Sequence, residues 1–189
     1  MSDSVSDPVS APVSDPWPIR TADVDDADAL LELVHAAYRG HGGQVGWTTE
    51  AELIDGPRTT RELLVADLDD PDITVLVAGE HVGCAAVTHP PGTPTASFGM
   101  FAVRPAGQGA GLGRALLAAA GDRARTTGAS AMEMCVIDRR AELIAWYERR
   151  GYTVTGETRP FPYGAPGVGY PRGDDFRFAV LVKRLARDA

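Results

Sequence analysis

Residues 101–114 read Phe-Ala-Val-Arg-Pro-Ala-Gly-Gln-Gly-Ala-Gly-Leu-Gly-Arg and lead directly into an amphipathic pattern over residues 115–123. Pro105 cannot continue a β-sheet ladder, so the apolar strand before it ends there. The glycines that follow allow the backbone to approach a ligand closely. The first N–H groups of the next helix have no partner within the helix, and the helix dipole favours negative charge at that end. The segment therefore predicts a strand, a phosphate-binding loop and a helix, in this order.

Two other phosphate-binding motifs do not fit this loop. A P-loop needs lysine and then serine or threonine after its last glycine, where this chain has Arg114 and Ala115. A dinucleotide-binding Gly-x-Gly-x-x-Gly frame that starts at Gly109 or Gly111 would end at Arg114 or Leu116, and neither is glycine. The remaining alternative is a surface loop that binds no ligand.

The composition is ordinary for a soluble globular protein. The chain has 189 residues, of which 44% are hydrophobic and 23% are charged, which is enough for one domain with a substantial core. A net charge of −8 argues against a nucleic-acid partner and fits a cationic substrate such as an amine. No apolar run approaches the roughly 18 residues of a membrane span, and no signal segment is recognisable. We therefore expect a cytoplasmic protein with no membrane partner.

The cysteines and histidines give no sign of a disulfide framework or a metal site. The two cysteines, Cys84 and Cys135, lie in apolar runs typical of buried strands. The four histidines show no metal-ligand spacing with each other or with the cysteines. We expect no bound metal.

The chain divides into a tail and one domain. Residues 1–16 carry few bulky side chains, which predicts a disordered tail, and the domain spans residues 17–189. Apolar periodicity and turn residues predict strands at 19–22, 73–78, 82–88, 96–103, 130–137, 152–157 and 175–185. They predict helices from a cap at 23–26 to 38, and at 48–53, 60–68, 112–127 and 141–149.

The loop motif Gln108-x-x-Gly111-x-Gly113, preceded by Phe-x-Val-x-Pro, resembles the acyl-CoA signature of the GNAT superfamily of N-acyltransferases. The order of elements from residue 19 to 185 is also similar to the GNAT fold. This resemblance implies an α/β fold with a mixed, mostly antiparallel central sheet of about six to seven strands, flanked by about four to five helices. It further implies transfer of an acetyl group from acetyl-CoA to a primary amine, by direct attack in a ternary complex.

The resemblance also implies which residues meet the co-substrate acetyl-CoA. The strand end and the loop correspond to Phe101, Ala102, Val103, Gln108, Gly109, Ala110, Gly111, Leu112, Gly113 and Arg114. In the family a main-chain N–H of this strand, here within residues 101–103, polarises the thioester carbonyl. Arg140 replaces an asparagine that touches the cofactor in many members. It could meet a CoA phosphate or be a solvated arginine at the start of a helix.

Residues 141–152 resemble the second GNAT signature, a helix that ends in aromatic-Tyr-x-x-x-Gly-aromatic. In the family the tyrosine, here Tyr147, projects toward the thioester sulfur. A thiol with a pKa near ~8.5 is a poor leaving group at neutral pH unless its sulfur is protonated or hydrogen-bonded. A phenol at the sulfur can donate that proton, which makes Tyr147 the candidate general acid. The alternative is that Tyr147 is only a core residue.

The glutamate bases of the family are absent from their usual places in this chain. Ser97 and Cys135 occupy the places where histone- and ribosomal-protein-acetylating members carry a glutamate. Glu133 shares a strand face with Cys135 and is the candidate base, although a solvated glutamate is the alternative. His89 and a water relay are the other routes for the amine proton.

The sequence leaves the acceptor open. We expect a small-molecule amine in preference to a protein amine, bound between residues 38–47 and 161–170. Many relatives dimerise, which leaves a homodimer open. The competing functions are a CoA-sensing module without turnover, and an acyltransferase that uses another acyl-CoA or a protein amine.

Overall fold

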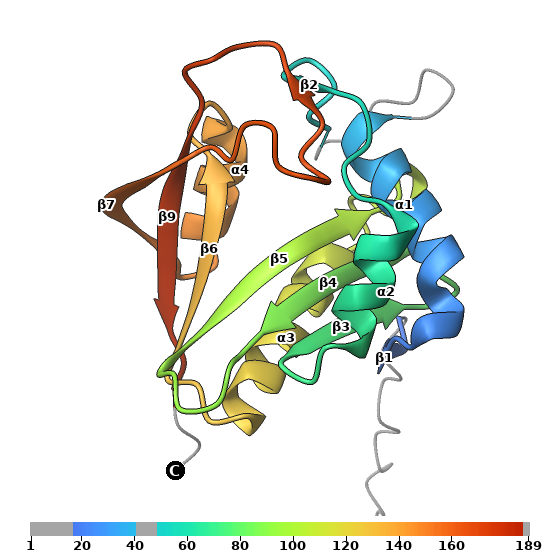
Figure 1. The fold of residues 1–189 in the computed structure, drawn as a ribbon. Helices are drawn as coiled ribbons and strands as arrows, with labels where there is room; N and C mark the ends of the chain where they lie inside the picture. Colours follow the sequence, from blue (N-terminus) through green and yellow to red (C-terminus); the bar gives the residue numbers. More distant parts are fainter. Residues whose placement is uncertain (1–16, 41–48, 187–189) are drawn as a thin grey trace, which may run out of the picture.

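The computed structural model describes residues 17–40 and 49–186, drawn as a coloured ribbon in Figure 1. The predicted tail, residues 1–16, lies outside the described residues. Within the described ranges, no helix is both long and apolar enough to cross a membrane.

A mixed seven-stranded sheet forms the centre of the fold (Figure 1). Across the sheet the strands are β1 (Ile19–Thr21), β3 (Ile73–Ala78), β4 (Gly83–Thr88), β5 (Thr95–Val103), β6 (Ala131–Ile137), β9 (Arg177–Arg184) and β7 (Thr153–Pro160). All neighbours are antiparallel except β5 and β6, which run parallel. The predicted fold class is confirmed.

Helices cover both faces of the sheet (Figure 1). Helix α1 (Ala27–Arg39), which follows the 3-10 turn η1 (Val24–Asp26), and helix α2 (Arg61–Asp69) pack on one face. Helices α3 (Leu112–Thr126) and α4 (Ala141–Glu148) pack on the other face, and the 3-10 turn η2 (Pro105–Gly107) precedes α3. In α3 the apolar repeat follows the helical period and is fully buried at Leu112, Leu116, Ala120 and Ala124.

The predicted helix over residues 48–53 is wrong for its described part. The Thr49 hydroxyl caps the N–H of Ala51 at 3.2 Å, and the N–H groups of Leu53 and Ile54 both donate to the Glu50 carbonyl. The turn ends there because β2 (Ile54–Asp55) pairs with β8 (Tyr170–Pro171) in a separate two-stranded sheet. A long-range strand pairing therefore overrides the local helix signal.

The two parallel strands separate along their length, which opens the sheet. β5 and β6 are paired only where Thr95–Ser97 lies beside Ala131–Glu133. Figure 1 shows the two strands diverging from this end like the arms of a V. Beyond this end, β5 and β6 are not paired with each other, and each keeps its antiparallel neighbour, β4 or β9.

Asp26 ties the first strand to the β3–β4 hairpin. Its carboxylate accepts hydrogen bonds from Arg20 at 2.6 and 2.7 Å and from the Asp23 N–H at 3.0 Å, and His81 Nε2 lies 2.6 Å from it. Asp26 itself is buried. The hydrogen bonds from Arg20, helped by those from Asp23 and His81, hold the pKa of Asp26 well below its usual range despite burial.

We expect Asp26→Asn to lower the free energy of unfolding at pH 7 by about 1–3 kcal/mol, because it removes the charge of a buried carboxylate that accepts hydrogen bonds from Arg20 and Asp23. The folded-state pKa is depressed, so this stabilisation is present above about pH 4 and is lost as the pH falls below that value. Urea unfolding between pH 7 and pH 3 measures both effects. The control is Asp28→Asn, at an exposed pair with Arg61, which should change stability by less than about 1 kcal/mol.

Candidate active site

A β-bulge lies in the middle of β5. The register between β4 and β5 shifts so that Ala85 faces two residues of β5, Met100 and Phe101. Met100 adopts a φ of 45°, which is unusual for a residue other than glycine. A bulge leaves one residue without its ladder partners, and such strain is typical of functional sites. The bulge thus interrupts the β4–β5 ladder at Met100 and Phe101, on one arm of the V. The carbonyls of these two residues accept hydrogen bonds from the Cys84 thiol at 3.4 Å and from the Tyr38 hydroxyl at 2.9 Å.

The glycine-rich loop presents a row of free amides. Gly109 and Gly111 have φ values of 87° and 86°, a conformation that favours glycine, and Gly111 is the N-cap of α3. Among the described residues, no backbone or side-chain acceptor binds the N–H groups of residues 109–113. The side-chain amide of Gln108 donates to the Val103 carbonyl at 3.1 Å and so joins the loop to the end of β5. A helix N-terminus preceded by such a loop is an arrangement that suits an anion.

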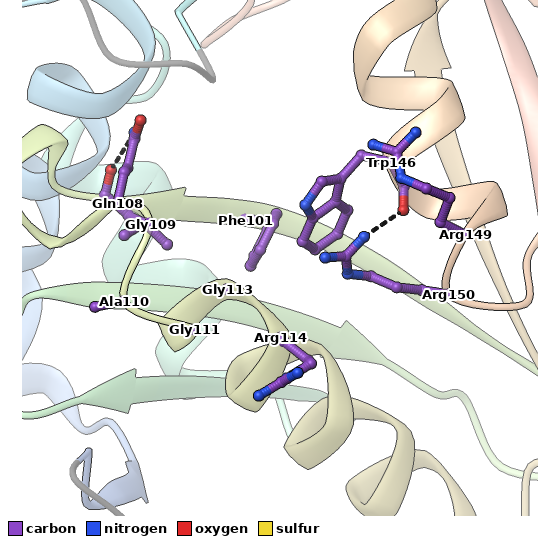
Figure 2. A pocket seen from close by; sticks show the side chains of 11 residues that line it. Phe101, Gln108, Gly109, Ala110, Gly111, Gly113, Arg114, Trp146, Arg149 and Arg150 are labelled. Carbon is purple, nitrogen blue, oxygen red and sulfur yellow. Dashed lines mark hydrogen bonds between the residues drawn. The ribbon is translucent and has the colours of Figure 1, made fainter.

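This loop borders an open pocket of about 1030 Å³, shown in Figure 2. From β5 and the loop it is lined by Phe101, Val103, Gln108, Gly109, Ala110, Gly111, Gly113 and Arg114. The opposite wall comes from α4 and the residues after it: Trp146, Arg149 and Arg150. No motif in the sequence predicted this wall, although the Arg-Arg pair that begins two residues after Tyr147 is a signal for it.

Positive charge gathers around this phosphate-loop pocket. The Arg150 guanidinium lies over the Trp146 ring, 3.5 Å from its centroid, and donates to the Trp146 carbonyl at 2.7 Å. Its buried Nε atom has no hydrogen-bond partner among the described residues. Burial, and then the neighbouring charges of Arg149 and Arg114, lower the pKa of Arg150. Three guanidinium groups and a row of free amides fit a polyanionic ligand.

A second, smaller pocket of about 90 Å³ lies between the arms of the V. Its apolar walls come mainly from β5 and β6, and its polar lining residues are Tyr38, Glu50, Arg58, Cys135, Arg140 and Tyr147. Phe101 lines both pockets, so the two meet at the bulge.

Tyr147 contributes a buried phenol to this second pocket. Only 3% of the residue is exposed, and its ring packs edge-on against Phe98, Trp146 and Tyr152. Burial raises the pKa of Tyr147 well above its usual value, so its hydroxyl keeps its proton at physiological pH. Within the described part of the chain, no residue forms a hydrogen bond with that hydroxyl. Tyr147 can therefore act as a hydrogen-bond donor toward a ligand.

Glu133, the predicted base, is placed at the closed end of the V. It pairs with Ser97 where β5 and β6 are still hydrogen-bonded, and it lines neither pocket. Both of its oxygens accept hydrogen bonds from Arg159, at 2.7 and 3.0 Å. Cys135 shares its strand face and does line the second pocket, but two strand positions separate them by about 7 Å. The alternation of side chains along β6 predicted which face of the sheet carries Glu133, but not that Glu133 lies at the closed end of the V.

His89 and one side of the predicted acceptor wall lie outside both pockets. The two ring nitrogens of His89 bind the Thr127 hydroxyl and the Thr93 carbonyl at 2.8 and 2.9 Å, and His89 lines neither pocket. Of the predicted acceptor wall, Tyr38 borders the second pocket and residues 161–170 do not, while residues 41–47 lie outside the described residues.

Three of the residues predicted to contact the cofactor do not line the phosphate-loop pocket. Arg140 borders the second pocket instead of the phosphate-loop pocket, with Nη1 3.9 Å from the Glu50 carboxylate. The side chains of Ala102 and Leu112 are buried in the core and line neither pocket. Only their backbones remain for contact with a ligand.

Glu50 is the acidic residue of the second pocket, and no motif in the sequence points to it. Its side chain is 13% exposed and lies 3.2 Å from Arg39 Nη1. No cluster of three or more histidine, cysteine, aspartate or glutamate side chains that could hold a metal occurs in the part of the chain that is described.

Comparisons with known proteins agree with this geometry. The family model of the acetyltransferase (GNAT) domain matches residues 64–154, which include the bulge, the glycine loop and Tyr147. A mycothiol acetyltransferase from Propionibacterium freudenreichii subsp. shermanii is 30% identical over 136 residues. These residues cover 69% of this chain but only 41% of that protein, so the chain spans less than half of the length of this relative.

Solved structures share the fold over nearly the whole chain. The ribosomal-protein-S18-alanine N-acetyltransferase from Escherichia coli has a TM-score of 0.65 at 18% identity, covering 92% of this chain and 96% of that chain. A Salmonella typhimurium protein solved with its cofactor acetyl-CoA has a TM-score of 0.61 at 24% identity, covering 93% and 97%. The family match, the shared fold and the motif on the diverging strands agree, and the chain belongs to the GNAT superfamily of acetyltransferases.

Proposed function

We propose that this chain transfers an acetyl group from acetyl-CoA to a primary amine, which attacks directly in a ternary complex. The observation that carries the proposal is the meeting of two different pockets at Phe101. One is suited to a polyanion, and the other contains a protonated, buried phenol. The presence of acetyl-CoA in a relative of the same fold supports this assignment.

The phosphate-loop pocket would hold the CoA portion of the co-substrate. The free amides of residues 109–113 and the guanidinium groups of Arg114, Arg149 and Arg150 would bind the pyrophosphate. Phe101 lies between this pocket and the second one and would contact the pantetheine. Acetyl-CoA supplies an acyl group that is activated as a thioester.

The second pocket would then supply the chemical groups. A main-chain N–H at the Met100–Phe101 bulge would polarise the acyl carbonyl, as an oxyanion-type donor does. The Tyr147 hydroxyl would hold a proton for the leaving sulfur, since a thiol pKa near ~8.5 makes the bare thiolate a poor leaving group at neutral pH.

Removal of the amine proton is assigned to Glu50 in preference to Glu133. An alkylamine with a pKa near ~10 is almost wholly protonated at pH 7 and cannot attack in that form. Glu50 lines the second pocket together with Tyr147, whereas Glu133 is bound to Arg159 outside it. Geometry comes before pKa in the choice of a base, and the geometry favours Glu50.

We expect Glu50→Gln to lower kcat/KM by about 10- to 100-fold at pH 7, with a defect that shrinks toward pH 10 as free amine becomes plentiful. Glu133→Gln should change the rate little and equally at every pH, because it acts only on the Arg159 contact. Steady-state assays of both variants from pH 6 to pH 10 make the comparison. A pH-dependent defect in Glu133→Gln alone would place the base at Glu133.

The overall activity is tested by thiol release from acetyl-CoA in the presence of a broad amine library. Release that depends on an added amine, with an N-acetylated product in the mass spectrum, supports the proposal. Tight CoA binding without release for any amine would point to a CoA-binding module. Release only with a longer acyl-CoA would change the donor.

A further inference from the structure

The second pocket carries charges of both signs, with the positive sign in excess. Arg58 and Arg140 border it together with one carboxylate, Glu50. That carboxylate already contacts two guanidinium groups, Arg39 at 3.2 Å and Arg140 at 3.9 Å. The negative net charge of the whole chain predicts the opposite, so this local excess of positive charge is a property of the pocket itself.

Arg58 is the cation that this arrangement leaves without a carboxylate. Its guanidinium carbon lies 5.1 Å from the centroid of the Tyr38 ring, and it is half-buried. Over residues 17–40 and 49–186, no ion pair or hydrogen bond engages its guanidinium. Residues 41–48, which lie outside the described ranges, contain no aspartate or glutamate. A partly desolvated cation without an anion is costly, which makes an anionic ligand favourable at this position.

The protein also holds Arg58 in a defined place. The Tyr38 hydroxyl donates to the Phe101 carbonyl at 2.9 Å, which fixes the ring under the guanidinium next to the bulge. Next in the chain, the Thr59 carbonyl binds His35 Nε2 at 3.0 Å, which anchors the segment to α1. The guanidinium is therefore fixed near the point where the acyl group would be transferred.

We infer that the acceptor is a zwitterion, in which the amine is accompanied by a carboxylate that binds Arg58. The inference rests on the proposed acetyl transfer and names its substrate class. The ammonium group would face Glu50, the carboxylate would face Arg58, and Met134, Val136 and Phe178 would contact an apolar side chain. The second pocket is small, about 90 Å³, which suits the head of a small α-amino acid better than a protein segment.

The test compares acceptors that differ only in the carboxylate. CoA release is measured with the proteinogenic L-α-amino acids and with their carboxamides. For the wild-type protein, the best amino acid should exceed its carboxamide in kcat/KM by at least about 10-fold, because charge-assisted hydrogen bonds to a guanidinium are strong. Arg58→Gln should lower kcat/KM for the amino acid by about 10- to 100-fold and leave the carboxamide nearly unchanged. Arg58→Lys should restore part of the loss.

Arg61→Gln is the matched control. Arg61 lies three residues further along the chain, and its exposed pair with Asp28 is remote from both pockets. This variant should behave as the wild type with every acceptor. Equal rates for amino acids and carboxamides, or an equal loss for both in Arg58→Gln, would overturn the inference while acetyl transfer stands.

Calorimetry separates the inference from the activity. Amino acids and carboxamides are titrated into the wild-type protein and Arg58→Gln, with CoA present. Tighter binding of amino acids, lost in Arg58→Gln, supports the recognition by Arg58 even if no amine releases CoA. Absence of CoA release with every amine would instead overturn the proposed function. Equal binding of acids and amides would overturn the inference in either case.

Discussion

Tyr147→Phe should lower kcat by about 10²- to 10⁴-fold, the usual contribution of general acid catalysis, while the affinity for CoA stays almost unchanged. The phenylalanine ring keeps the packing against Phe98, Trp146 and Tyr152. No hydrogen bond within the described protein is lost with the hydroxyl, so the folded state should be unaffected. Rapid measurement of thiol release, together with calorimetry of CoA binding, separates the two effects.

The control is Tyr152→Phe. The Tyr152 hydroxyl is buried in the same aromatic cluster and has no hydrogen-bond partner among the described residues, and Tyr152 lines neither pocket. Removal of this hydroxyl should leave kcat unchanged and should not destabilise the fold. Equal losses in both variants would show that the phenols act only through packing.

The pH dependence provides a second check on Tyr147. Burial raises its pKa well above the usual value, so the phenol remains protonated through the alkaline range of the assay. Loss of a proton from Tyr147 therefore should not reduce kcat below pH 10. A fall in the wild-type rate near pH 8 that disappears in Tyr147→Phe would contradict the assigned acid, because it would show that the phenol ionises there.

Local sequence predicted those parts of the site that are built by local structure. The strand end, the loop and the helix N-terminus are consecutive in the chain, so residues 101–114 contain the complete loop geometry. Tyr147 was proposed from the resemblance of residues 141–152 to a family signature, which is likewise a continuous stretch of the chain. Apolar periodicity also predicted the strands of the main sheet, because each long apolar run forms a strand or a helix close to its expected limits.

The parts that were missed depend on contacts between distant segments. Glu50 and Arg58 reach the second pocket only because α1 places Tyr38 beside β5, and neither residue belongs to a motif. The predicted helix before β2 fails because β8 pairs there from more than a hundred residues away. The position of Glu133 could not be predicted either. Periodicity shows which face of a strand a residue occupies, but not where two neighbouring strands separate.

The largest effect on binding is expected at Gly111, where Gly111→Val should weaken CoA binding by at least about 100-fold. Gly111 has a φ of 86° at the N-cap of α3, and a β-branched residue in that conformation is strained by about 1–2 kcal/mol. A Cβ there would meet only Arg114 Nη2, at 3.9 Å, so the new side chain would point into the space that the phosphates require. Loss of two hydrogen bonds to a charged acceptor, at about 1.5–3 kcal/mol each, accounts for a change of this size.

Gly128→Val is the matched control for this variant, because it imposes the same strain at the other end of the same helix. Gly128 has a φ of 96° after the C-terminus of α3, a Cβ added to it would meet no described atom within 4 Å, and it lines neither pocket. Both variants should show a similar decrease in thermal stability, and only Gly111→Val should lose affinity for CoA in calorimetry. Wild-type affinity in Gly111→Val would exclude this loop as the phosphate site. An equal loss of CoA affinity in both variants would attribute the loss to destabilisation of the fold. Only Gly111 belongs to the loop at residues 109–113 whose N–H groups would bind the phosphates.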